Sequence, residues 1–149
     1  MSQQLQVDPA ALLAQAQALR ERLTALQTTI TQLEQARINV RRAIETAKSL
    51  ASDEILAPTD PDYNGMIMVK PINKEKILVK LGGNIYAKVP VEKAVEILEK
   101  RADSLEKQVQ FLMKEYDETL RALESIESLL QQLAVIAQQP QQPQQPKQS

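Results

Sequence analysis

The sequence predicts a mostly helical α+β chain: a long antiparallel coiled-coil hairpin with two β-hairpins (four short strands) at its base. Three observations support this fold class. Residues 10–57 and 91–139 contain neither glycine nor proline and are rich in residues with high helix propensity. Apolar residues recur at coiled-coil spacing in both stretches. All three glycines lie between them, among short runs of β-branched and aliphatic residues.

The apolar spacing averages about 3.5 residues in both long stretches. The first series is Leu12, Ala16, Leu19, Leu23, Leu26, Ile30, Leu33, Arg37, Val40, Ile44 and Ala47. The second is Val95, Leu98, Ala102, Leu105, Val109, Leu112, Tyr116, Thr119, Leu123, Ile126, Leu130, Leu133 and Ala137. Only Arg37 and Thr119 are plainly polar, so each series predicts a helix that buries its seam against the other.

Four segments follow from composition. A first helix is expected over 8–52, with Asp8 as its N-cap and Pro9 in its first turn. An assembly module of two β-hairpins is expected over 53–90, a second helix over 91–138, and a disordered Gln- and Pro-rich tail over 139–149.

The expected strands are 54–58, 66–70, 76–81 and 85–89, with a tight loop at Gly82 and Gly83. Each strand has apolar residues on both faces or nearly so, and two hairpins leave open strand edges. Such edges invite pairing with another chain. The expected subunit-interface residues are Met66, Ile67, Met68, Val69, Ile77, Leu78, Val79, Leu81, Ile85 and Tyr86.

Composition excludes several classes of function. The net charge of −1 argues against a broad nucleic-acid footprint. The chain has neither cysteine nor histidine, which removes disulfides, thiolate metal sites and the commonest general base. No pair of carboxylates is placed as a general acid and base. We therefore expect no enzyme activity, no metal and no cofactor. No apolar run is long enough to span a bilayer and the N-terminus does not resemble a signal peptide, so a cytoplasmic protein is expected.

The segment "DPDYNG" at residues 60–65 resembles the first half of an EF-hand calcium loop. An EF-hand needs a glutamate at loop position 12, but that position holds Pro71. Positions 7 and 9 fall on Met66 and Met68, inside an expected strand. The segment is therefore interpreted as a turn between strands, with weak adventitious cation binding as the alternative.

Two other motifs are better explained by structure than by a binding function. "LGGN" at 81–84 lacks the spacing of a phosphate-binding loop and is expected to be a hairpin turn. Arg37, Arg41 and Arg42 could form a nucleic-acid patch, but a solvated helix face with one seam cation is favoured. The Arg37 stem can pack in the seam while its charged head reaches water.

The order helix, two β-hairpins, helix resembles prefoldin, specifically the archaeal α type, from about Val7 to Ala137. "EILAP" is similar to the first strand of that family, and "KILVKLGGNIYAKVPVEKAVEILEKR" is similar to its strand, glycine turn, strand and second-helix entry. The segment "TDPDYNGM" is longer and more polar than the glycine turn expected in the first hairpin.

The resemblance implies an ATP-independent holdase chaperone that passes unfolded proteins to a group II chaperonin. It implies a hexamer of two α and four β subunits, in which this chain meets β subunits and a second copy of itself. The hairpins would build an oligomeric β-barrel body that carries the coiled coils. A filament-forming γ type is an alternative member of the same family. Neither nucleic acid nor membrane is an expected partner.

The antiparallel hairpin brings together two chain ends that carry more apolar residues than a seam needs. These candidate client-binding residues are Leu5, Val7, Leu12, Leu13, Ala16, Leu19, Leu129, Leu130, Leu133, Val135 and Ile136. Seam packing is an equal alternative for Leu12, Leu19, Leu130 and Leu133, whereas client contact is favoured for Leu13, Val135 and Ile136. The rival function is a structural tether or adaptor whose coiled-coil tips bind one defined partner.

Overall fold

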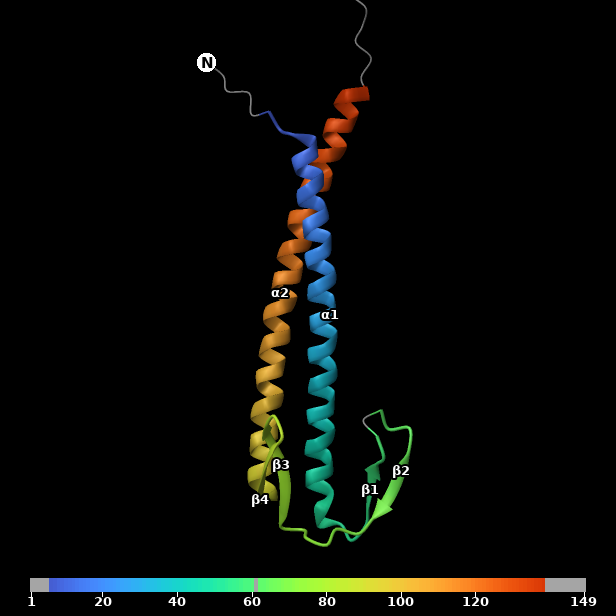
Figure 1. Ribbon diagram of the computed structural model, residues 1–149, viewed down its shortest axis with the longest axis vertical. Helices are drawn as coiled ribbons and strands as arrows, with labels where there is room; N and C mark the ends of the chain where they lie inside the picture. Colours follow the sequence, from blue (N-terminus) through green and yellow to red (C-terminus); the bar gives the residue numbers. More distant parts are fainter. Residues whose placement is uncertain (1–5, 61, 139–149) are drawn as a thin grey trace, which may run out of the picture. The chain divides into compact units, whose positions relative to one another are not determined.

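The computed structural model describes residues 6–60 and 62–138. Helix α1 (Pro9–Lys48) is followed by a short 3₁₀ turn η1 (Ser49–Ala51). Strands β1 (Ile55–Pro58) and β2 (Met66–Val69) form one antiparallel hairpin, and β3 (Lys76–Gly82) and β4 (Ile85–Pro90) form a second. Helix α2 (Val91–Gln138) is the last element of the described residues (Figure 1). The predicted fold class, two long helices with two inserted hairpins, is confirmed.

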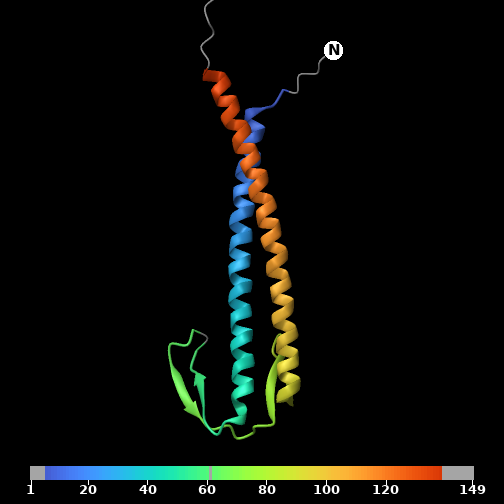
Figure 2. The same ribbon diagram turned by 180° about the vertical axis from the view of Figure 1, so that it is seen from behind.

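The chain forms two compact units, which are described separately. The terminal unit contains the first part of α1, to Thr28, and the part of α2 from Met113 onwards. The central unit, Thr29–Leu112, contains the rest of both helices and both hairpins. In each unit the two helices lie side by side and run in opposite directions (Figures 1 and 2).

The predicted seam is the face that the helices bury. Every residue of the two apolar series is buried or half-buried except Ala137, near the end of α2. Thr119, the polar member of the second series, is buried, but its hydroxyl donates a hydrogen bond to the Glu115 carbonyl at 2.7 Å. A buried hydroxyl with a partner carries little desolvation penalty, so the polar residue fits the seam.

Local hydrogen bonds explain where α1 begins and where it ends. The Ala10 amide donates to Asp8 Oδ1 at 3.0 Å, which is the predicted N-cap, and Pro9 fills the first helical position. At the other end the chain tightens into η1, where the Ser52 amide donates to the Ser49 carbonyl at 3.0 Å. The α-helix therefore ends at Lys48, a few residues before the expected position.

The second hairpin is anchored in the hydrophobic core of the central unit. Val79 of β3 packs with Ile44 of α1 and with Ala94 and Leu98 of α2. Ile77, Val89 and the helix residues Val40, Val95 and Ile97 pack around this cluster. Gly83 turns the hairpin with a φ of 52°, a left-handed conformation that glycine adopts without strain.

Candidate interaction surfaces

The polar turn of the first hairpin is organised around the Asp60 carboxylate. Asp60 Oδ1 accepts hydrogen bonds from the Asp62 amide at 2.8 Å, the Asn64 amide at 3.3 Å and Asn64 Nδ2 at 3.2 Å. The Thr59 hydroxyl donates to Asp60 Oδ2 at 3.3 Å. Burial opposes the effect, but the hydrogen bonds from the backbone amides, Thr59 and Asn64 lower the pKa of Asp60. The segment that resembles a calcium loop thus uses its first carboxylate to hold a turn.

The turn needs a glycine at position 65 for a steric reason that is unrelated to calcium. A Cβ atom at this position would lie 2.5 Å from the Thr59 hydroxyl oxygen. The single proton of that hydroxyl is shared between Asp60 Oδ2 and the Gly65 carbonyl, which lies at 3.1 Å, and the Thr59 amide donates to the same carbonyl at 2.9 Å. The glycine therefore permits a close approach that closes the turn.

The turn is also attached to α1. The guanidinium carbon of Arg42 lies 4.2 Å from the centre of the Tyr63 ring, a cation–π contact. Tyr63 adopts a φ of 62°, which is uncommon for a non-glycine residue. Sequence reasoning placed Arg42 on a solvated face and missed this contact, because no spacing rule links a helix to a turn some twenty residues later.

The first hairpin exposes most of its apolar side chains. Leu56 and Met68 lie opposite each other in the strand register, and both are well exposed. Met66 and Ile67 are also exposed, whereas Val69 is half-buried. A two-stranded sheet with such a surface and two free edges is marginally stable in isolation, so this surface is a candidate for cover by a partner.

The second hairpin has two different faces. The face with Ile77 and Val79 packs on the helices, and Val79 is only 4% exposed. The opposite face carries Leu78, which is 67% exposed, and Tyr86 among lysines. Leu81 and Ile85, next to the turn, are exposed as well. Of the predicted interface residues in this hairpin, Val79 belongs to the core of its own chain, whereas Leu78, Leu81, Ile85 and Tyr86 are available to a partner.

An apolar groove of about 630 Å³ lies between α1 and the two hairpins in the central unit. Its lining includes Val40 and Ala43 of α1, Tyr63 of the first turn, and Leu78 and Tyr86 of the second hairpin. Arg101 of α2 also lines it and donates to the Lys80 carbonyl of β3. The exposed strand residues and this groove are together the candidate assembly region, and Leu78 and Tyr86 belong to both.

The terminal unit carries a second apolar surface. Val7, Leu13, Leu129, Val135 and Ile136 are all exposed there, and we call this set the terminal apolar surface. Leu13 is 58% and Ile136 66% exposed. The seam residues near them differ, since Ala16 is buried and Leu12, Leu19, Leu130 and Leu133 are half-buried. Leu5 and the tail 139–149 lie outside the described residues.

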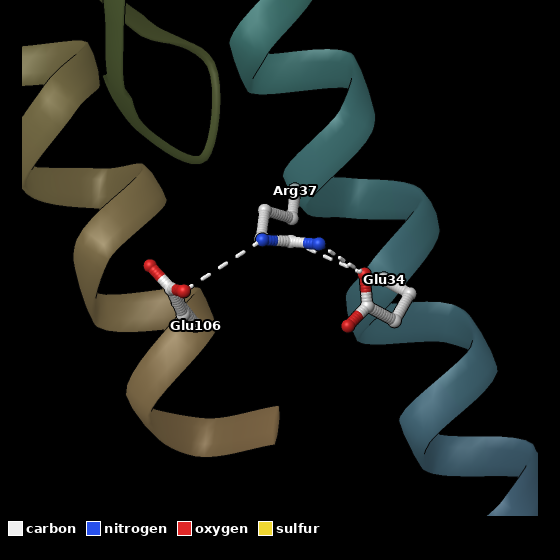
Figure 3. Close-up of polar contacts among 3 residues, drawn as sticks. All are labelled: Glu34, Arg37 and Glu106. Carbon is white, nitrogen blue, oxygen red and sulfur yellow. Dashed lines mark hydrogen bonds and ion pairs between the residues drawn. The ribbon is translucent and has the colours of Figure 1, made fainter. Parts of the chain in front are cut away.

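A polar layer interrupts the seam in the central unit. Arg37 donates from Nε and Nη2 to Glu34 Oε2 on its own helix, at 3.1 and 2.9 Å. Its Nη1 lies 3.9 Å from Glu106 Oε1 on α2 (Figure 3). All three side chains keep between 32% and 44% of their surface exposed, so the charged groups remain in contact with water as predicted for Arg37.

No group of three or more acidic side chains that could hold a metal ion is found among residues 6–60 and 62–138. Within the same residues, neither helix contains a segment apolar enough for a membrane span.

A family model and curated relatives of this chain point to the same family. A family model described as "Prefoldin subunit" matches residues 13–135. A prefoldin subunit alpha from Aeropyrum pernix is 36% identical over 123 residues, which cover 81% of each chain. One from Sulfurisphaera tokodaii is 33% identical over 112 residues, or 74% of each chain. A solved structure titled filamentous PFD from Methanocaldococcus jannaschii aligns at 24% identity with a TM-score of 0.46, covering 80% of this chain and 94% of that one.

Proposed function

This chain belongs to the prefoldin family, a family of chaperone subunits, and from that premise we propose that it is an ATP-independent holdase subunit that binds unfolded proteins. The observation that carries the proposal is the terminal apolar surface. Val7 precedes α1, Leu13 lies near the start of α1, and the other three lie near the end of α2. None of the five belongs to the two seam series. Large apolar side chains left exposed near both helix ends of one unit are a common feature of interaction sites.

The chemistry of this surface suits promiscuous binding. Burial of apolar area contributes about 25 cal/mol per Å² and has no directional requirement, so many client sequences can supply the complementary side chains. Each contact surface is small, and a single one gives weak binding. Several such surfaces in one assembly would raise the overall affinity by acting on the same client.

We further propose that the chain assembles as α2β4, with two copies of this chain and four β subunits, and that the hairpins form the body of the assembly. Four strands per chain, exposed apolar strand residues and free strand edges support this arrangement. Clients held in this way would then be delivered to a group II chaperonin. Native mass spectrometry of the chain expressed with a β subunit gives the stoichiometry directly.

The client-binding proposal is tested with the triple variant Leu13→Ser, Val135→Ser, Ile136→Ser in the assembled oligomer. Protection of several unrelated denatured proteins from aggregation should fall, while the native mass stays unchanged. The matched control is Ile38→Ser with Phe111→Ser, which removes exposed apolar side chains from the helices of the central unit. Protection that survives in the triple variant would contradict client binding at the terminal apolar surface. Protection limited to one protein would contradict the holdase proposal and favour a tether.

A further inference from the structure

The second hairpin has an exposed face that carries positive charge and no carboxylate. Successive side chains of a strand point to opposite faces, and here Val79, Ile77 and Val89 pack on the helix residues of the core. The exposed residues alternate with these along β3 and β4. We call the following exposed set the outer face: Lys76, Leu78, Lys80, Tyr86 and Lys88.

The three lysines of the outer face are close neighbours. Lys88 lies opposite Leu78 in the strand register, so Lys76 and Lys80, two residues to either side of Leu78, are its diagonal neighbours. Diagonal neighbours on one face of a sheet are about 7–8 Å apart, within reach of long side chains. This separation is comparable with the Debye length of about 8 Å at physiological salt, so the three charges repel one another.

Most other lysines of the chain have a compensating carboxylate. Six of them lie within 3.9 Å of a carboxylate oxygen: Lys48, Lys70, Lys74, Lys93, Lys100 and Lys114. Within residues 6–60 and 62–138, the three lysines of the outer face form no such ion pair. The positive charge of this face is therefore left for a group outside the chain to neutralise.

The strands of a second copy cannot supply that group. Strands β1 to β4 contain neither aspartate nor glutamate. Asp53 and Glu54, just before β1, form ion pairs with Lys74 and Lys70, and the Asp60 carboxylate accepts the amides that hold the first turn. Two outer faces laid against each other would oppose lysine with lysine, which is unfavourable. A complementary strand face must come from a different subunit.

The groove of the central unit has the same sign of charge as the outer face that adjoins it. Its lining includes Arg42, Lys80 and Arg101, and no carboxylate is found among the described residues that line it. Leu78 and Tyr86 belong to both surfaces. A docking strand thus meets apolar side chains surrounded by cations.

We infer that the outer face recognises a strand face of the β subunit that carries Asp or Glu side chains around apolar residues, and that its lysines select this partner over a second copy of the chain. The inference rests on the proposed assembly with β subunits and adds the chemistry that decides which strands pair. Leu78 and Tyr86 supply apolar area to bury, while opposite charge provides specificity and speeds association. Charge attraction acts before contact, so association slows as salt rises.

The test compares two charge reversals that change the net charge equally. One variant combines Lys76→Glu, Lys80→Glu and Lys88→Glu on the outer face. The matched control reverses three exposed cations of the helices that form no ion pair within the described residues, as Arg41→Glu, Lys107→Glu and Arg121→Glu. Circular dichroism checks that both variants keep the helical content of the parent. Association with an immobilised β subunit is followed by biolayer interferometry.

The outer-face variant should associate at least about tenfold more slowly than the parent at low salt, whereas the control should stay within about threefold. The association rate of the parent should fall at least about fivefold between roughly 0.05 and 0.5 M NaCl. Replacing the same three lysines with glutamine should reduce this salt dependence. A β subunit whose strand carboxylates are changed to lysine should restore the association of the outer-face variant.

Several results would overturn the inference. They are an unchanged rate in the outer-face variant, an equal loss in the control, a parent rate that does not depend on salt, and failure of the charge-swapped β subunit to restore association. Binding of a fluorescein-labelled single-stranded RNA that is lost in the outer-face variant would assign the face to nucleic acid instead. The native mass of the parent with the β subunit reports separately on the assembly proposal, because that mass does not depend on how the strands recognise each other.

Discussion

Arg37 and Glu106 face each other across the helix pair of the central unit, with 3.9 Å between Nη1 and Oε1 (Figure 3). Arg37 occupies a seam position that apolar side chains hold elsewhere in the series. Partly exposed ion pairs contribute little net stability, whereas a polar residue in a seam restricts the register in which two helices can pair. The pair is therefore expected to fix register more than it stabilises the fold.

Arg37→Leu tests this relationship. The free energy of unfolding should stay within about 1 kcal/mol of the parent value or rise, because leucine buries apolar area in place of a charge. The distance distribution between spin labels at Gln35→Cys and Lys107→Cys should broaden, and the absence of native cysteine makes this labelling specific. Arg41→Leu, an exposed position off the seam, is the control and should change neither quantity. A narrow distribution in Arg37→Leu would refute the register role.

The two hairpins should respond differently to polar substitutions. Leu56→Ser with Met68→Ser removes the exposed cross-strand pair of the first hairpin, so the oligomer should dissociate while the helical content of the chain is kept. Val79→Ser should instead destabilise the chain itself by about 2–3 kcal/mol, since Val79 packs with Ile44, Ala94 and Leu98.

Sedimentation and circular dichroism separate these two outcomes. Leu56→Met with Met68→Leu keeps the pair apolar and should assemble as the parent does. An unchanged oligomer mass in the double serine variant would show that the first hairpin is not part of the subunit interface.

Calcium should not bind specifically at the first turn. The Asp60 carboxylate is occupied by backbone amides, and Pro71 stands where an EF-hand has its bidentate glutamate. Isothermal titration calorimetry should detect no stoichiometric site tighter than about 100 μM. A heat signal that saturates at one calcium per chain and disappears in Asp60→Ala would disprove this expectation.

The first turn should be sensitive to acid. Hydrogen bonds lower the pKa of Asp60 in the folded chain below its ordinary value of 3.8. The stabilisation from this carboxylate is therefore fully present above that value and is lost as the pH falls through the lowered folded pKa. Carboxyl ¹³C NMR should give a titration midpoint below 3.8 in the folded chain and an ordinary midpoint in denaturant. Equal midpoints in the two states would show that the turn hydrogen bonds do not form in solution.

Periodicity was sufficient to predict the helices and their buried faces. Leu26, Leu98 and Val109, for example, were placed in the seam by spacing alone, and all three are buried. Glycine positions and short aliphatic runs likewise located the four strands. These features are local in sequence, because helix and strand geometry repeat over a few residues.

Contacts between elements that are distant in the sequence could not be predicted in this way. Ile77, Leu78 and Val79 are all apolar, so no alternation indicates which face of β3 packs on the helices. Only the structure shows that Val79 enters the core while Leu78 stays exposed. The Arg42–Tyr63 contact depends on the path of a turn, and turn geometry is weakly encoded in residue type. The residues of the terminal apolar surface were predicted from the sequence, and their function is a proposal.

The packing of Val79 in the core also affects the free energy with which subunits associate. A chain whose second hairpin is already fixed in its own core presents part of its docking surface before it meets a partner, so that part adds no ordering cost to association. The first hairpin, with its exposed Leu56 and Met68, contributes no residue to this core and is attached to α1 by the Arg42–Tyr63 contact at its turn. It would therefore lose more conformational entropy when it docks. Any substitution that loosens the Val79 cluster would reduce the fraction of competent monomers. The apparent dissociation constant of the assembly would then rise in inverse proportion to that fraction, even though no residue in contact with the partner had changed.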